Sequence, residues 1–396
     1  MSYDVAALRA QFPALAAGTA HFDGPGGSQT PAVVAQAVAD AMTSPIANRG
    51  SVTEAEKHAD GIVLRARAAM ADLLDADPRG IVFGRSTTAL LFDLARTLAG
   101  TWGPGDEVVV TRLDHDANIR PWVLAAESVG ATVRWLDFDP DTTELDDVAT
   151  VLSPRTRLVA VTGASNLVGT RPPVRAIADA AHAVGAVTVV DGVHLTSHAA
   201  ISVAELGADV YACSPYKFCG PHLGVLAARP ELLEELRPAK LLPSSDAVPE
   251  RFELGTLPYE LLAGTTAAVD FLAGICGSTA DRRAALVETM GAIEAHEDPL
   301  RARLEAGLAE LPGVVVRSRA AHRTPTLLLQ LDRPADAYRY LADRRVNAPA
   351  SSFYALEASR RLGLGDTGGL RVGLAPYTCA EDVERLLAGL RDFLQL

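Results

Sequence analysis

Two ionisable side chains, Lys217 and Asp191, follow apolar segments of the sequence at the points where these segments end. Asp191 comes directly after the apolar run 187–190, and Lys217 follows about 26 residues later in 214–221, a turn rich in Ser, Gly and Pro. A lysine amine can form a Schiff base with an aldehyde, and a carboxylate can keep a pyridine nitrogen protonated. A single loop lysine is more often a surface group, so it is the pairing that indicates a pyridoxal phosphate (PLP) site.

The composition is that of an ordinary globular enzyme. The 396 residues are 48% hydrophobic and 21% charged, which is enough for a large core and predicts two domains. A net charge of −13 argues against nucleic acid and anionic membranes as partners. No apolar stretch is long enough to span a bilayer, and residues 1–5 do not resemble a signal peptide. The four cysteines have neither metal-site nor disulfide spacing, so we expect a cytoplasmic enzyme.

Strand and helix patterns alternate between about residues 60 and 230. Continuous apolar strands separated by amphipathic helices are typical of an α/β fold with a mostly parallel sheet that is covered on both faces. Seven strands are predicted, at 81–83, 107–111, 133–136, 158–162, 187–190, 210–212 and 224–227. The helices between or before them are predicted at 62–74, 88–98, 122–128 and 174–184.

The last third of the chain has a different pattern. Long helices are predicted at 265–272, 282–311 and 379–396, and Thr378 with Glu381 predicts a capping box for the last of them. Strands are predicted at 314–316, 326–331 and 370–374. We therefore expect a large domain over 21–260 and a smaller α+β domain formed by 1–20 and 261–396.

Several polar residues follow predicted strand ends. In parallel sheets, ligands bind beyond the carboxyl ends of the strands, so these residues should meet at one edge. Hydroxyls and free N–H groups at a helix start also suit a phosphate, although helix capping alone would explain the three hydroxyl residues. The residues are Ser86, Thr87, Thr88, His115, Asn166 and Asp191.

These motifs, in this order, resemble the class V aminotransferases, and within them the cysteine desulfurase-like group of fold-type I PLP enzymes. The resemblance runs from the segment FDGPGGS at 22–28 to the closing helix. It implies that Lys217 carries PLP, that Asp191 holds the pyridinium nitrogen and that His115 stacks on the ring. Asn166 and His194 would lie near the phenolic oxygen, with His194 where relatives often have glutamine.

The same resemblance assigns the residues that would bind the phosphate group of PLP. Ser86, Thr87, Thr88, Ser214 and Tyr216 would contact the phosphate, with Tyr216 replacing a histidine that is common in the family.

Substrate and subunit contacts also follow from the resemblance. Arg371 would clamp the α-carboxylate of an amino-acid substrate. Asn48 and Arg49 lie in a loop that often faces the site in relatives. Thr256 would reach the phosphate of a partner subunit, which implies a homodimer.

One departure from the desulfurase pattern bears on the reaction. Desulfurases carry a sulfur-accepting cysteine on a loop before the carboxylate-binding arginine, but the corresponding residues here, 346–357, include no cysteine. Cys219 and Cys379 lie elsewhere, and free cysteines more often serve as small buried hydrophobes. We therefore expect a C–S lyase that releases thiol, pyruvate and ammonia from cysteine or a cysteine S-conjugate.

Other outcomes stay open. They are decarboxylating or oxidative deamination, epimerisation, transamination, persulfide-forming desulfuration, and a PLP-binding protein that catalyses nothing.

Overall fold

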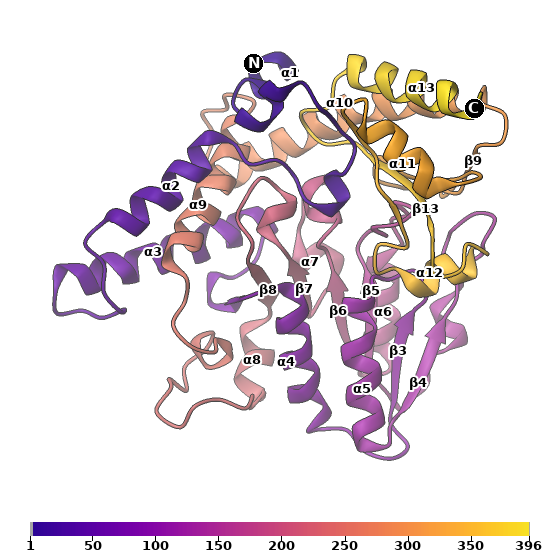
Figure 1. The fold of residues 1–396 in the computed structure, drawn as a ribbon. Coiled ribbons are helices and arrows are strands. Elements are labelled where there is room, and N and C mark those ends of the chain that lie inside the picture. Colours follow the sequence, from indigo (N-terminus) through magenta and orange to yellow (C-terminus); the bar gives the residue numbers. More distant parts are fainter. Residues whose placement is uncertain (1–2, 396) are drawn as a thin grey trace.

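A seven-stranded sheet forms the centre of the protein in the computed structural model, which describes residues 3–395 (Figure 1). Only β8 runs antiparallel to its neighbours, and the other adjacent strands are parallel, which confirms the prediction of a mostly parallel sheet. In spatial order the strands are β2 (Ile81–Gly84), β8 (Gly224–Ala228), β7 (Val210–Cys213), β6 (Val187–Asp191), β5 (Thr156–Thr162), β3 (Glu107–Thr111) and β4 (Thr132–Leu136).

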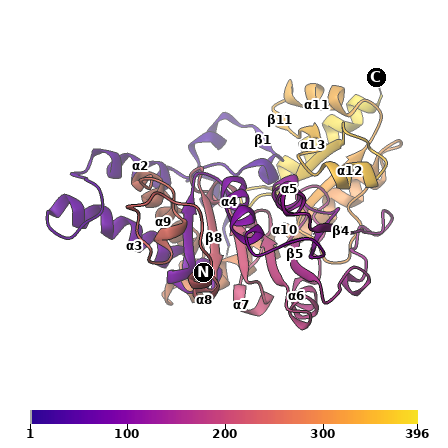
Figure 2. The ribbon, with the colours of Figure 1, turned by 90° about the horizontal axis from the view of Figure 1, so that it is seen from below.

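Helices cover both faces of this sheet (Figures 1 and 2). On one face lie α4 (Thr87–Ala99) and α5 (Arg120–Val129), and on the other lie α6 (Val174–Ala183) and the short α7 (Val203–Leu206). Because side chains alternate along a strand, Val108 and Val110 of β3 pack with α4 and α5, whereas Val109 packs with the opposite cluster. Burial on both faces explains the continuous apolar runs in the sequence.

A layer of three helices flanks the β8 side of the sheet (Figure 1). It consists of α2 (Ala32–Thr43), α3 (Glu54–Leu74) and α9 (Tyr259–Gly274), and α9 contacts both of the others. Leu262, Val269 and Leu272 of α9 belong to the core of the large sheet. The domain boundary near residue 260 remains a proposal, and the packing joins α9 to the large sheet.

A second sheet lies among the C-terminal helices (Figure 1). Its antiparallel strands are, in order, β12 (Ala350–Ser351), β13 (Gly369–Gly373), β10 (Thr326–Gln330) and β9 (Val315–Val316). The helices that accompany this sheet are α10 (Arg282–Ala309), α11 (Pro334–Ala342), α12 (Leu356–Arg361) and α13 (Ala380–Leu394). The short helix α8 (Pro230–Glu235) instead packs with α4 and α5 on one face of the large sheet.

The N-terminal segment joins this C-terminal part. After α1 (Val5–Arg9), strand β1 (Ala20–His21) pairs in parallel with β11 (Val346–Asn347). Arg9 also forms an ion pair with Asp382 of α13, with 2.7 Å between Nη1 and Oδ2. The beginning and the end of the chain are therefore held together beside β13.

The predicted cap of the last helix is wrong by one residue. Cys379 is the N-cap, and its N–H donates to Oδ2 of Asp382 over 3.1 Å. Thr378 instead accepts a hydrogen bond from the N–H of Ala375, because the chain turns before the helix begins. Within residues 3–395, no helix combines the length and the apolar character needed to cross a membrane.

Candidate active site

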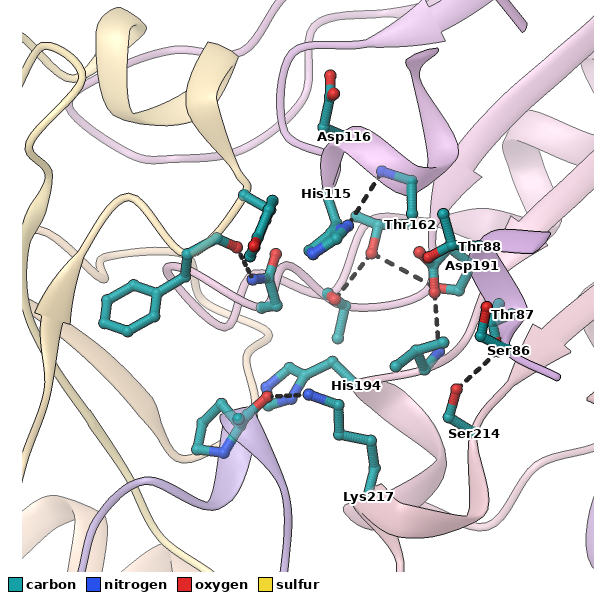
Figure 3. Close-up of a pocket in the computed structure, with 18 of the residues that line it drawn as sticks. Ser86, Thr87, Thr88, His115, Asp116, Thr162, Asp191, His194, Ser214 and Lys217 are labelled. Atoms are coloured by element: carbon teal, nitrogen blue, oxygen red, sulfur yellow. Dashed lines mark hydrogen bonds between the residues drawn. The ribbon is translucent and has the colours of Figure 1, made fainter. Parts of the chain in front are cut away.

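A cavity of about 690 Å³ opens at the carboxyl edge of the large sheet. Segments that follow β2, β3, β5, β6 and β7 border it, together with β13 of the C-terminal part. Most of the candidate residues line this one cavity, and Figure 3 shows several of them around a shared space. They are Ser86, Thr87, Thr88, His115, Asn166, Asp191, His194, Ser214, Tyr216, Lys217 and Arg371.

Lys217 ends the 3₁₀ helix η7 (Pro215–Lys217), which directly follows β7. Its Nζ donates a hydrogen bond to the carbonyl oxygen of Pro25 (Figure 3). Burial and, to a smaller extent, nearby Arg371 lower the pKa of this amine to about 7, while Asp191 opposes the shift. A large fraction of the amine is therefore neutral near pH 7, which is the form that attacks an aldehyde.

Asp191 is the last residue of β6, and only 5% of it is exposed. Its Oδ1 accepts a hydrogen bond of 2.9 Å from the N–H of Val193. Burial raises the pKa of the carboxyl to about 6, against the opposing effects of that hydrogen bond and of Lys217. The next residue, Gly192, lies directly against the ring of Tyr211, where a Cβ would overlap the ring.

His115 lies on the segment after β3 and is the N-cap of η4 (Asp116–Asn118). Its Nδ1 accepts a hydrogen bond of 3.0 Å from the N–H of Ala117, which places the ring proton on Nε2. Burial lowers the pKa of the imidazole to about 4, as do Lys217 and Arg371, whereas Asp116 opposes them. The cavity therefore contains a neutral, flat ring at this position.

The first turn of α4 forms another wall of the cavity. Ser86 caps the helix by accepting from the N–H of Ala89 over 3.1 Å, and Oγ1 of Thr87 contacts Oγ of Ser214 over 2.7 Å. Gly224 lets β8 approach this turn, because a Cβ there would overlap the backbone of Ser86. A helix N-terminus fixed in this way is suited to a phosphate group.

Arg371 lies in β13 and is 3% exposed. Its Nη1 donates to the carbonyl oxygen of Asn166 over 2.9 Å, and its Nε has no hydrogen-bond partner among residues 3–395. Burial lowers the pKa of the guanidinium to about 9, and Asp23 and Tyr216 oppose this shift. A buried cation with unfilled donor capacity is suited to a substrate carboxylate.

Two further aromatic residues of the cavity wall, His194 and Tyr216, contact side chains of the surrounding protein. Nε2 of His194 lies 2.9 Å from Oγ1 of Thr324 and 3.0 Å from Oγ1 of Thr326. Burial holds the pKa of His194 well below its usual value, with His198, Lys217 and Arg371 acting in the same direction. The ring of Tyr216 stacks on that of His222 at 4.6 Å.

The residues present fit PLP and an amino acid. Oδ1 of Asn166 and Nε of Arg371 are buried without hydrogen-bond partners in the described part of the chain. Lys217, Asp191 and the start of α4 supply an amine, a buried carboxylate and an anion site around the same cavity. When bound, PLP supplies an aldehyde carbon for imine formation and a protonated ring that takes up electrons released at Cα.

Three candidate residues do not line this cavity. Arg49 instead forms ion pairs with Asp60 at 2.8 Å and Glu250 at 3.1 Å. Asn48 and Thr256 are exposed on the single chain. Their assignment to substrate binding and to a partner subunit's phosphate remains a proposal.

The structure also adds residues to the cavity wall that the sequence analysis did not single out. Asp116 and Arg120 form an ion pair of 3.1 Å at spacing i, i+4, a pattern that the sequence could have revealed. Phe353 and Tyr354 contribute from the loop before α12, and no local signal in the sequence predicts their orientation.

Comparisons with known proteins identify the family of the chain. The sequence model described as "Aminotransferase class-V" matches residues 20–386. A cysteine desulfurase of Dickeya dadantii is 31% identical, over 100% of this chain and 98% of its own. An aminotransferase-like protein, FGM3 of Gibberella zeae, is 31% identical, over 99% of each chain. The crystal structure of the cysteine desulfurase CsdA from Escherichia coli superposes with a TM-score of 0.88 at 27% identity, and the match covers 100% of this chain and 99% of that chain. The chain therefore belongs to the class V aminotransferase family of PLP-dependent enzymes and has their fold-type I architecture.

Proposed function

We propose that this enzyme cleaves the C–S bond of cysteine or a cysteine S-conjugate by β-elimination. The observation that carries the proposal is the absence of a thiol from the cavity wall within residues 3–395. Cys213, Cys219 and Cys276 are buried elsewhere, and Cys379 caps α13. Without an acceptor cysteine at the cavity, the sulfur would leave as a free thiol.

The residues of the chain divide the work of this reaction. Arg371 would hold the substrate carboxylate and so orient the bonds at Cα. The neutral amine of Lys217 would take the Cα proton as a general base. Asp191, buried and anionic, would stabilise the positive charge on the cofactor's ring nitrogen. The neutral ring of His115 would cover the cofactor without adding a charge.

The overall reaction is balanced without an oxidant. One molecule of the S-conjugate and one of water give one thiol, one pyruvate and one ammonia. The C–S bond breaks, the sulfur takes up a proton, and water replaces the amine at the former Cα.

The names of several relatives favour an alternative. Proteins of about 30% identity along the whole chain are called cysteine desulfurases, which supports persulfide formation as the second candidate. Decarboxylation, epimerisation and transamination would use the same Lys217, Asp191 and Arg371. The nature of the products separates these reactions.

The test is a product analysis with cysteine and S-benzylcysteine. We expect thiol, or sulfide from cysteine, in a 1:1 ratio with pyruvate, together with ammonia. Alanine together with a protein-bound persulfide that dithiothreitol releases would identify a desulfurase instead. Carbon dioxide, a keto acid that retains sulfur, or an inverted amino acid would each indicate one of the other reactions.

We also propose that the enzyme is a homodimer with Thr256 directed toward the partner's phosphate site. The segment around Thr256 exposes apolar side chains on the single chain, with Leu242 96%, Leu241 66% and Leu254 58% exposed. Exposed leucines of this kind would be covered at a subunit interface. Sedimentation at about twice the chain mass of 41.6 kDa would support the dimer, and sedimentation as a monomer would contradict it.

A further inference from the structure

Two consecutive aromatic residues of the cavity wall adopt an unusual backbone conformation. Phe353 has a φ of 52° and Tyr354 a φ of 59°. The left-handed region is uncommon for residues other than glycine and is unfavourable for bulky side chains. Such conformations persist where surrounding contacts hold them, and they are frequent at ligand sites.

Contacts with other parts of the site hold both residues in place. The carbonyl oxygen of Phe353 accepts from Nδ2 of Asn166 over 3.0 Å. The carbonyl oxygen of Tyr354 accepts from the N–H of Asp116 over 2.7 Å. Each carbonyl is therefore bound to a segment that carries another site residue, and the left-handed backbone directs the two side chains.

The Phe353 ring lies against the carboxylate clamp. The Cζ of Arg371 is 3.7 Å from the ring centroid, within the range of a cation–π contact. Nη1 of Arg371 is bound to the carbonyl oxygen of Asn166, so two contacts fix the plane of the guanidinium. The Phe353 ring also packs against the cluster that contains Leu113 and Leu167.

The Tyr354 ring lies at the outer side of the same wall. Its centroid is 5.5 Å from that of His115, with 33° between the ring planes, and the residue is 76% exposed. In Figure 3, His115 and Asp116 lie on the same side of the pocket. Asp116 and Arg120 also line the cavity, but their charged groups pair with each other. The face of the Tyr354 ring is therefore the flat, apolar surface that this part of the wall offers to a ligand.

We propose that Tyr354 is a specificity-determining residue that contacts a flat, apolar or aromatic substituent on the substrate sulfur, and that Phe353 is a positioning residue that orients Arg371. This proposal rests on the proposed function, because it assigns the group attached to sulfur. A substrate anchored by its carboxylate at Arg371 would extend along the Phe353–Tyr354 wall. Aromatic surfaces favour flat apolar groups through offset stacking.

The experiment measures binding of two acids that lack an amine and therefore do not react. Calorimetry on the PLP-loaded enzyme would compare propionate with 3-(benzylthio)propionate. We expect the benzyl compound to bind more tightly to the unaltered protein. Tyr354→Ala should weaken binding of the benzyl compound about three- to tenfold and leave propionate unchanged.

Two variants serve as matched controls for Tyr354. Tyr354→Phe retains the ring and should retain the preference for the benzyl compound. Tyr338→Ala removes a 40% exposed tyrosine of α11 outside the cavity and should change neither affinity. An unchanged benzyl preference in Tyr354→Ala would overturn the assignment, as would equal weakening of both acids.

Substitution of Phe353 should affect the two affinities differently from substitution of Tyr354. Phe353→Leu retains an apolar side chain but removes the π face, and it should weaken both acids equally, about three- to tenfold. Phe353→Tyr should restore both affinities, which a general loss of folding would not allow. Unchanged propionate binding in Phe353→Leu would overturn the positioning role.

These outcomes are independent of the reaction type. If S-benzylcysteine yields no thiol but Tyr354→Ala still abolishes the benzyl preference, the proposed reaction fails and the contact stands. If thiol and pyruvate form but the preference survives in Tyr354→Ala, the reaction stands and this inference fails.

Discussion

Asp191 and Glu107 are buried carboxylates at opposite ends of the parallel strands, Asp191 at a carboxyl end and Glu107 at an amino end. They differ in their hydrogen-bond partners. Glu107, the first residue of β3, has a side chain that is 3% exposed. It accepts from Arg134 at 2.8 Å, Arg155 at 2.7 Å and Ser153 at 2.7 Å. Within residues 3–395, the carboxylate of Asp191, the last residue of β6, accepts one hydrogen bond, from the N–H of Val193.

The difference separates a structural charge from a functional one. The hydrogen bonds from Arg134, Ser153 and Arg155 lower the pKa of Glu107 to about 2, so its charge is stabilised within the chain. Burial raises the pKa of Asp191 to about 6, because few partners replace the lost water. A buried charge that the protein leaves incompletely paired is suited to a ligand of opposite charge.

The largest effect is expected for turnover in Asp191→Asn. The substitution keeps the shape and the hydrogen bond from Val193 but removes the negative charge beneath the cofactor ring. We expect turnover to fall about 10²–10³-fold, as when a preorganised electrostatic group is removed from an active site. Steady-state rates with S-benzylcysteine would measure the loss, and a rate within a fewfold of the original would contradict the role of Asp191.

The same substitution should stabilise the cofactor-free protein. A pKa raised from 3.8 to about 6 disfavours folding once the unfolded carboxyl ionises, so stability falls as pH rises from about 4 to 6. Asp191→Asn should thus gain about 2–3 kcal/mol of unfolding free energy at pH 7 and nothing below pH 4. Urea unfolding at both pH values would measure the gain. No gain at pH 7 would mean that burial of the ionised Asp191 carboxylate does not destabilise the fold.

Glu107→Gln should show a smaller effect of the opposite sign. A depressed pKa stabilises the fold above the unfolded value of 4.5, and that contribution is lost as pH falls toward about 2. Because Arg134 and Arg155 are 47% and 62% exposed, we expect a loss of only about 1–2 kcal/mol at pH 7. Urea unfolding would measure it, with PLP absorbance unchanged as a control; a larger loss at pH 3 than at pH 7 would contradict the comparison.

Much of the large sheet could be predicted from local sequence. The sequence pattern predicts all seven strands within a few residues of their observed bounds, because all of them except β4 are largely apolar runs that helices bury on both faces. The two-residue strands β1 and β11 were not predicted, since their pairing joins Ala20 to Val346 across most of the chain. Helix α2 was also missed.

The site residues also fall into two groups, those that the sequence could predict and those that it could not. Residues at strand ends, such as His115 and Asp191, could be predicted because the parallel sheet brings those ends together. Arg49 was expected near the substrate but pairs with Asp60 and Glu250, and sequence alone does not reveal these partners. The Phe353–Tyr354 wall could not be predicted, because tertiary contacts determine its left-handed backbone.

The most direct test of the account is to identify which lysine carries the cofactor. The chain has three lysines, and Lys57 and Lys240 form ion pairs with Glu54 and Asp246, whereas Lys217 alone lines the cavity. Borohydride reduction of the PLP-loaded enzyme, followed by peptide mass spectrometry, should place one phosphopyridoxyl group on Lys217, and Lys217→Ala should carry none. A group on Lys57 or Lys240, or no attached group, would contradict the central claim.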